Sequence, residues 1–213
     1  MKIIRIVKKD EKNVVLYFDN NEKLYLSYEV FLKSGLRKND DIPEDRFSFL
    51  VNENKIYFLK QKAFRYLGRR LHSAYEIKLK LKQKNYDNDL IDSIIEELKI
   101  SNYINDYDFA KMFAEENIKN KFWGRRKVES ELFKKGIERE TILQVLSEKF
   151  SGENEINKAL ELGKKKLKTL LNRNLGDDKV MSKLISFLIT RGYDYETSRR
   201  TAEALINKSP DDF

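Results

Sequence analysis

The same helix–stop–helix pattern occurs three times in the chain, and this repetition constrains the fold more than any other feature. The copies align on Leu81, Leu132 and Leu188. An apolar residue lies four positions before each leucine, and a base lies three positions after it. Because residues four apart share one face of a helix, each copy predicts a helix that packs through one side.

The residues that follow each leucine predict where this helix stops. Asn85, Gly136 and Gly192 hold equivalent positions, and Asn and Gly tolerate the left-handed backbone that ends many helices. A bulky apolar residue comes next, followed by an acid that suits the start of a second helix. The apolar residues of these second helices are Leu90, Ile91, Ile94, Ile95 and Leu98 in the first copy, Ile142, Val145, Leu146 and Phe150 in the second, and Ala202, Leu205 and Ile206 in the third.

A further helix precedes each pair. The first is expected to end near Leu71, and the second to be capped by Asn105 or Asp106. The apolar faces expected for the three are Ala63, Phe64, Leu67 and Leu71; Phe109, Ala110, Phe113 and Ala114; and Ile156, Leu160, Leu167 and Leu171. A three-helix unit of this size buries little surface alone and gains by stacking on its neighbour. The fold is therefore predicted to be mainly α, with three tandem three-helix repeats in an elongated curved array and a small N-terminal antiparallel β element.

The N-terminal part has a different pattern. Residues 1–28 contain runs rich in β-branched and aromatic residues joined by short turns, which predicts three strands, and a short helix should end at Gly35. Pro43 suits the first position of the next helix, but Lys55–Leu59 fits a strand as well as a helix. The predicted division is a β-rich extension at residues 1–60 and helical repeats at residues 61–102, 103–152 and 153–213.

Composition excludes several kinds of active site. The chain has no Cys and one His, His72, so thiolate sites, disulfides and Ser–His triads are not expected. No phosphate-binding glycine loop is present, and Asn105, Asp106 and Asp108 fit helix capping better than a calcium loop. No run of apolar residues approaches the length of a membrane span. We therefore expect a cytoplasmic protein that is not an enzyme, needs no cofactor or metal and does not bind membranes.

Basic residues gather in particular segments. The net charge is +8. Residues 60–84 hold nine bases and one acid, residues 119–135 hold seven bases and two acids, and residues 163–173 hold five bases and no acid. Clusters of this kind are typical of proteins that bind nucleic acid or another anionic partner, although a solvated helix surface explains them equally well.

Four segments stand out in the helical part of the chain, and they are "YLGRRLHSAYEIKLKLKQKNY", "YINDYDFA", "GRRKVESELFKKGI" and "LITRGYDYE". They span about residues 60–205, and in their order and spacing they resemble the RecX family of bacterial regulators of the RecA recombinase. The chain departs from the family's usual pattern at His72, where an Arg is common, and at Arg125, where a Pro is common. The N-terminal strands resemble an extension found in some members.

The resemblance implies a regulator that binds in the groove of the RecA–single-stranded DNA filament. Such a regulator mostly inhibits growth of the filament, its ATPase activity and strand exchange. The resemblance also implies a role in DNA repair and the SOS response. The alternative is a basic repeat protein that binds DNA directly and competes for it. We expect a monomer. The residues predicted to contact RecA or DNA are Arg69, Arg70, Lys78, Lys82, Lys121, Trp123, Arg125, Arg126, Lys127, Lys164, Lys165 and Lys168. Trp123 also fits packing between repeats, and Tyr103 and Phe109 are expected in the core.

Overall fold

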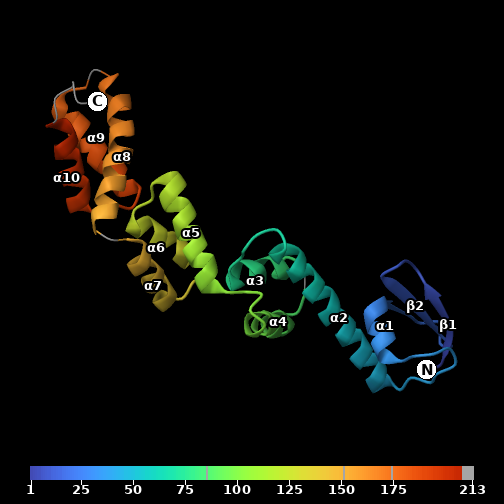
Figure 1. Ribbon diagram of the computed structural model, residues 1–213. Coiled ribbons are helices and arrows are strands. Elements are labelled where there is room, and N and C mark those ends of the chain that lie inside the picture. The colour runs from blue at the N-terminus through green and yellow to red at the C-terminus, as the bar shows by residue number, and fades with distance from the viewer. Residues whose placement is uncertain (85, 151, 174, 208–213) are drawn as a thin grey trace. The chain divides into compact units, whose positions relative to one another are not determined.

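The computed structural model describes residues 1–84, 86–150, 152–173 and 175–207. Three strands and ten helices lie in these ranges, which confirms the mainly helical fold with a small antiparallel sheet (Figure 1). The chain divides into two compact units. The first unit contains residues 1–72 and 77–104, and the second contains residues 73–76 and the chain from Asn105 onward.

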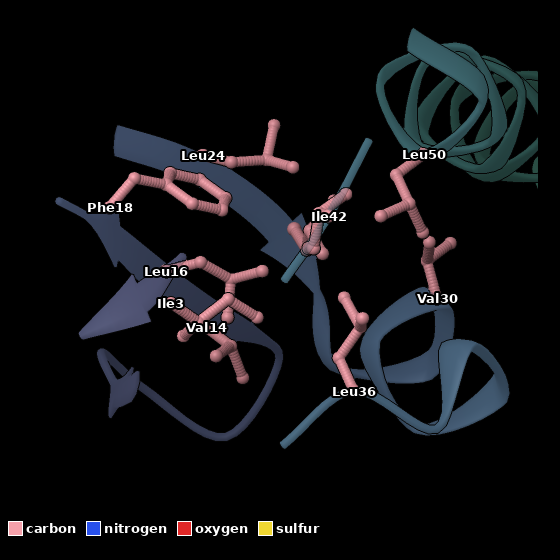
Figure 2. Close-up of a cluster of buried hydrophobic side chains, with 10 residues drawn as sticks. Ile3, Val14, Leu16, Phe18, Leu24, Val30, Leu36, Ile42 and Leu50 are labelled. Atoms are coloured by element: carbon pink, nitrogen blue, oxygen red, sulfur yellow. The ribbon is translucent and has the colours of Figure 1, made fainter. Parts of the chain in front are cut away.

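The sheet of the first unit contains β1 (Ile3–Lys8), β2 (Asn13–Phe18) and β3 (Lys23–Ser27), antiparallel in the order β1-β2-β3. Val15 of β2 is buried although it lies on the outer face of the sheet. The core-facing residues of β2 and β3 alternate along each strand, because successive side chains of a strand point to opposite faces. Figure 2 shows these side chains packed with residues from α1 (Tyr28–Ser34) and α2 (Glu44–Leu67). The sheet and the two helices thus share one hydrophobic core.

The helices of the first unit refine three expectations. Gly35 ends α1 with a φ of 67°, as predicted. Lys55–Leu59 lies within the continuous helix α2, which rules out the strand alternative, and Pro43 is the N-cap rather than the first helical residue. The expected end near Leu71 is wrong, because α2 stops at Leu67 and the chain turns at Gly68. The Leu71 side chain is exposed as a result.

Eight helices form the three repeats after α2. The first pair is α3 (Ala74–Lys82) and α4 (Asn88–Ile100). The second repeat contains α5 (Asp106–Lys121), α6 (Arg125–Lys134) and α7 (Arg139–Lys149). The third contains α8 (Gly152–Leu171), α9 (Asp177–Thr190) and α10 (Tyr195–Ile206). The three aligned leucines, Leu81, Leu132 and Leu188, are fully buried, as the pattern predicted.

The helix stops have the predicted geometry in the second and third repeats. Gly136 has a φ of 72° and Gly192 a φ of 97°. The apolar residue after each glycine, Ile137 or Tyr193, is buried, and its N–H donates to the carbonyl of the aligned leucine. The equivalent Asn85 lies outside the described residues. These contacts fix the turn between the last two helices of a repeat.

Two expectations about the core are wrong. Tyr103 is exposed and lies edge-on to Phe64, whereas Phe109 is buried as expected. Ile156 and Leu171 are also exposed. Helix α8 instead packs through a face that contains Gly163. Because this glycine has no Cβ, the Leu205 side chain of α10 can approach closely, with its Cδ1 atom 2.6 Å from where a Cβ would lie. Leu167 of the predicted face is buried as expected, but the rest of the buried stripe consists of Ala159, Leu162 and Leu170, which the prediction did not include.

Candidate binding surface at the repeat joints

Consecutive repeats meet where a helix stop docks on the start of an earlier helix. In the first joint, Lys135 and Gly136 lie against Ser73–Glu76, all within the second unit. The Ser73 hydroxyl donates to the Lys135 carbonyl at 2.7 Å and accepts from the Glu76 N–H at 3.1 Å. A Cβ at Gly136 would clash with the Tyr75 Cβ, so only glycine permits this approach.

Side chains complete the first joint with opposite charges. The Asp106 carboxylate accepts from the Ala74 N–H at 2.8 Å and so caps α3, while Asn105 caps its own helix α5. The Lys135 ammonium lies 2.6 Å from the Glu76 carboxylate, whose side chain is 11% exposed. The charged groups of this joint are thus directed at one another rather than outward.

The second joint repeats the same docking one repeat later. Arg191 and Gly192 lie against Gly124–Lys127, and the alignment makes these residues equivalent to those of the first joint. The Gly124 N–H donates to the Arg191 carbonyl at 2.8 Å, and the Arg126 N–H donates to the Gly192 carbonyl at 3.0 Å. A Cβ at Gly192 would clash with the Lys127 backbone nitrogen. The carbonyls of one helix stop therefore satisfy N–H groups at the start of the other helix.

The start of α6 carries bases in place of the acids that usually stabilise a helix N-terminus. Arg125, Arg126 and Lys127 occupy the first turn, which contains no acid. The negative charge comes instead from α8, because the Glu155 carboxylate accepts from the Arg125 N–H at 3.3 Å. Burial raises the pKa of Glu155, since a charged carboxylate is costly to remove from water. Arg126 is exposed.

Two aromatic residues link α5 to α6 and pack on different repeats. Phe122, with a φ of 53°, packs on the core of the third repeat, and Trp123 packs on the core of the second. The Trp123 ring lies edge-on to Phe113, with ring centroids 6.0 Å apart. The buried Tyr193 hydroxyl donates to the Phe122 carbonyl at 3.1 Å, and burial raises the pKa of this phenol. Trp123 therefore packs within its own repeat, and it is Phe122 that packs on the next one.

Ammonium groups lie over both of these rings. The Nζ atoms of Lys121 and Lys127 lie 4.8 and 5.7 Å from the Trp123 centroid. The Nζ atoms of Lys158 and Lys165 lie 5.4 and 4.3 Å from the Phe122 centroid. Cations over an aromatic face are attracted by its quadrupole, which holds them in place without neutralising their charge. We name this group the basic joint surface: Lys121, Phe122, Trp123, Arg126, Lys127, Lys158, Lys165 and Arg191.

Acids compensate part of this surface. Lys127 lies 3.2 Å from the Glu131 carboxylate, and Lys165 lies 3.2 Å from the Glu161 carboxylate. The pKa of Glu131 is lowered by its hydrogen bonds with lysines, Lys134 being the larger cause and Lys127 the smaller. Arg191 belongs to the surface because its guanidinium donates to the Lys121 carbonyl at 3.2 Å.

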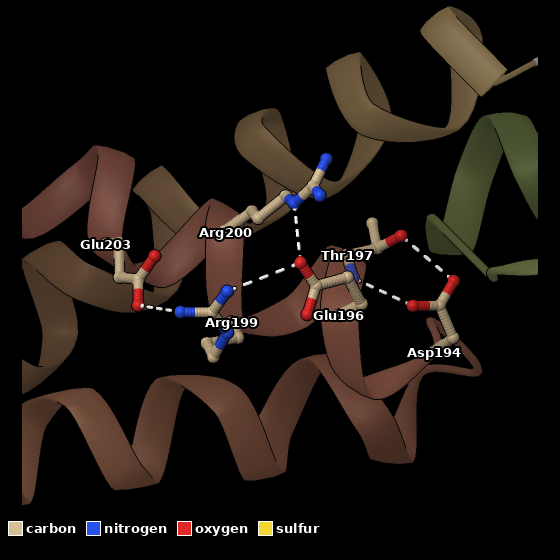
Figure 3. A network of polar contacts seen from close by, with 6 residues as sticks. All are labelled: Asp194, Glu196, Thr197, Arg199, Arg200 and Glu203. Atoms are coloured by element: carbon tan, nitrogen blue, oxygen red, sulfur yellow. Dashed lines mark hydrogen bonds and ion pairs between the residues drawn. The ribbon is translucent and has the colours of Figure 1, made fainter.

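The bases of α10 are paired along their own helix. Figure 3 shows Arg199 between Glu196 and Glu203, and Arg200 on Glu196. Asp194 accepts from the Thr197 N–H at 2.7 Å, and this bond together with the nearby Arg126 lowers its pKa, the Thr197 bond being the larger cause. We therefore leave Arg199 and Arg200 out of the basic joint surface.

The predicted residues outside this surface lie in varied surroundings. In the first unit, the Lys78 ammonium lies 2.5 Å from Asp92 of α4, while Arg69, Arg70 and Lys82 are exposed. Lys164 and Lys168 are exposed on α8. Lys158 and Arg191 were absent from the prediction, because they come to Phe122 and Lys121 from distant helices and leave no local signal.

The fold and this surface define the class of the protein, an array of three-helix repeats joined by docked helix stops. In the part of the chain that the structure describes, no group of His, Cys, Asp and Glu side chains is placed to hold a metal ion. No helix there is long and apolar enough to cross a membrane. Models of the first, second and third three-helix domains of RecX match residues 60–98, 105–146 and 153–201. The chain belongs to the RecX family, whose members are regulatory proteins rather than enzymes.

Relatives match along nearly the whole chain. Regulatory protein RecX of Clostridium botulinum (strain Eklund 17B) is 30% identical over 206 residues, covering 96% of this chain and 95% of the relative. The Clostridium beijerinckii protein is 30% identical over 210 residues, covering 99% and 97%. A crystal structure of regulatory protein RecX superposes with a TM-score of 0.77 at 20% identity, over 95% of this chain and 98% of that one. RecX from Lactobacillus salivarius gives 0.63 at 22% identity, over 71% and 96%.

Proposed function

We propose that this protein regulates a RecA-type recombinase by binding its filament on single-stranded DNA, and that the basic joint surface makes the central contact. The binding mostly inhibits filament growth, ATPase and strand exchange. The observation that carries the proposal is the cluster of cations around Phe122 and Trp123, at the joint between two repeats of a RecX chain.

The chemistry of the surface suits such a partner. A nucleoprotein filament presents DNA phosphates and acidic side chains at regular intervals, and both bind ammonium and guanidinium groups. The rings of Phe122 and Trp123 limit the motion of the lysines above them, so less entropy is lost when these lysines meet an anion. Arg126 adds an exposed guanidinium beside them.

Other predicted residues are proposed as further contacts, each within its own unit. Arg69, Arg70 and Lys82 in the first unit, and Lys164 and Lys168 on α8, are exposed bases that we propose as additional contacts. Lys78 contributes less because its ammonium is already paired with Asp92. Arg125 supports the surface mainly through its backbone, which binds Glu155.

The proposal is tested by titrating the protein into an ATPase assay of the cognate recombinase on single-stranded DNA. Arg126→Glu combined with Lys121→Glu should raise the half-inhibitory concentration about tenfold or more, because each charge-assisted hydrogen bond contributes about 1.5–3 kcal/mol. Lys38→Glu makes the same kind of charge change at an exposed lysine outside the surface and is the control. Equal inhibition by all three proteins would remove the basic joint surface from the contact.

The single tryptophan offers a second readout. Because Trp123 lies beneath Lys121 and Lys127, a partner that binds these cations should change the intrinsic fluorescence of the protein. Adding preformed filament is expected to shift or quench this emission in the wild type, and less so in the Lys121→Glu variant at the same concentration. Unchanged emission alongside full inhibition would place the contact elsewhere.

A second candidate function is direct DNA binding that competes with the recombinase. Cations interleaved with aromatic rings favour it, since this combination is typical of proteins that bind single strands. Binding to naked DNA should then weaken steeply with salt, the slope growing by roughly 0.7 for each neutralised phosphate. Parallel salt titrations with naked DNA and with filament separate the candidates, because a clear preference for filament supports the first.

A further inference from the structure

The outer face of the N-terminal sheet combines bases and tyrosines in a regular pattern. Residues that pair across the strands place Arg5 of β1, Tyr17 of β2 and Lys23 of β3 in one row. The neighbouring row on the same face contains Val7, Val15 and Tyr25. The opposite face carries the core side chains of Figure 2, so these two rows lie on the face away from that core, although Val15, between Val7 and Tyr25, is itself buried.

The rings of this face hold the cations beside them. The Arg5 guanidinium lies 4.8 Å and the Lys23 ammonium 5.3 Å from the centroid of Tyr17. The Lys9 ammonium lies 5.3 Å from the centroid of Tyr25. Tyr17 therefore positions two cations on either side of the middle strand, and Tyr25 positions a third.

Tyr25 is the ring of this face that offers an exposed surface. Its side chain is 54% exposed, although the backbone around it is firmly held. The Asn54 amide of α2 donates to the Tyr25 carbonyl at 2.8 Å, and its oxygen accepts from the Ser27 N–H at 2.7 Å. An exposed ring on a fixed strand is a suitable surface for stacking, because little conformational entropy remains to be lost on binding.

The charge of the two rows indicates the chemistry of the ligand. Arg5, Lys9 and Lys23 are basic, and none of the residues in the two rows is acidic. The acids of this region lie in the hairpin turns at residues 9–12 and 19–22. An anionic ligand with flat apolar rings matches both the cations and Tyr25, and a single-stranded nucleic acid has phosphates and bases in this alternation.

We propose that the outer face of β1–β3 binds single-stranded nucleic acid, with Arg5, Lys9 and Lys23 on successive phosphates and a base stacked on Tyr25. This gives the N-terminal extension a site of its own, separate from the basic joint surface. The inference does not require that the protein act on a recombinase, and it is tested without one.

The test measures the anisotropy of a labelled oligothymidylate titrated with the full chain. Tyr25→Ala should weaken binding about tenfold, because stacking of a base on an aromatic side chain contributes about 1–3 kcal/mol. Tyr25→Phe should retain the affinity and Tyr25→Leu should lose it, which assigns the effect to the ring and not to bulk in the sheet. Tyr195→Ala is the matched control, since this tyrosine is 60% exposed but lies beside Asp194 and Glu196.

The charges are tested by the dependence on salt. Arg5→Gln with Lys23→Gln should reduce the slope of log K against log salt by roughly 0.7 for each lost phosphate contact, whereas Lys38→Gln should leave it unchanged. Unaltered affinity and slope in these variants and in Tyr25→Ala would overturn the proposal. The proposal would also be overturned if polyglutamate displaced the labelled oligonucleotide as effectively as unlabelled oligothymidylate does. That result would assign the face to acidic polypeptides.

Discussion

The two joints between repeats share their backbone geometry but differ in their side chains. In both, a glycine with positive φ approaches the start of an earlier helix, and the carbonyl before that glycine accepts a hydrogen bond there. The first joint adds a Ser hydroxyl, a capping Asp and the Lys135–Glu76 ion pair. The second joint has Gly124 in place of Ser73 and three bases in the following turn.

This difference teaches which part of a repeat carries structure and which part is available for function. The first joint satisfies its charged groups internally, so little of its charge remains for a partner. In the second joint, Glu155 of α8 accepts from the start of α6 and Glu131 pairs with Lys127, but Arg126 stays exposed and Lys127 also lies over the Trp123 ring. The same docking therefore serves as a connection in one place and as the base of the proposed binding surface in the other.

The largest expected effect is the loss of the second joint in Gly192→Ala. A Cβ there would clash with the Lys127 backbone nitrogen, and the φ of 97° is unfavourable for alanine. We expect the free energy of unfolding to fall by about 3 kcal/mol, from the left-handed backbone and the steric clash together. Urea denaturation followed by circular dichroism measures this loss.

Gly35→Ala separates the two causes. Gly35 also has positive φ, but no heavy atom of the described chain lies within 4 Å of the position that a Cβ would take there. The substitution Gly35→Ala should lower the free energy of unfolding by only about 1 kcal/mol, which is the cost of the left-handed backbone alone. Equal losses in the Gly192 and Gly35 variants would mean that close docking contributes nothing beyond backbone conformation.

The next largest effect tests whether the Ser73 hydroxyl, which is present only in the first of the two joints, stabilises the docking. Ser73→Ala removes a fully buried group that both donates to the Lys135 carbonyl and caps α3. We expect a loss of about 1–2 kcal/mol, as for other helix caps. Ser93→Ala is the matched control, because the exposed Ser93 hydroxyl donates to the Leu90 carbonyl of its own helix. A Ser73 variant as stable as the Ser93 variant would show that the docking does not need this bond.

The smallest effect concerns the pH dependence of stability that comes from Glu155, the carboxylate of α8 that accepts from the Arg125 N–H in the second joint. Burial raises the pKa of Glu155 in the folded protein, so the folded state holds this proton more tightly than the unfolded state does. The resulting stabilisation is present at acid pH and is lost as pH rises through the raised pKa. Glu155→Gln stays neutral, and its melting temperature should therefore rise relative to the wild type between about pH 4 and pH 7.

The opposite trend is equally informative for the comparison. A Glu155→Gln variant that loses stability relative to the wild type as pH rises would show that the carboxylate is worth more as a charged cap for α6 than its burial costs. The second joint would then depend on opposite charge, as the first one does.

Much of the fold was predictable because helix faces and stops are local properties. The positions of Leu81, Leu132 and Leu188 follow from four-residue spacing alone, and all three are buried. The left-handed stops at Gly136 and Gly192 follow from the residue type. The end of α2 and part of the buried face of α8 were mispredicted, because Leu71 and Ile156 continue an apolar spacing that the packing does not use, whereas Leu167 of the predicted face is buried.

The candidate site was predictable only in part. Lys121, Trp123 and Lys127 lie close together in sequence, and the structure brings them together around one ring. Lys158, Arg191 and Glu155 reach the same place from α8 and from the stop after α9. No periodicity marks these residues, since each faces the joint through the packing of whole helices.

The sequence by itself determined that this chain forms three helical repeats with glycine stops, because spacing and backbone freedom act over a few residues. Only the tertiary structure decided what each stop docks against. The physical reason is that a helix stop exposes carbonyls and a helix start exposes N–H groups, and their partners come from another repeat. The glycine pair at Gly124 and Gly192 serves this contact between distant segments, and the cations around Trp123 and Phe122 are gathered by it.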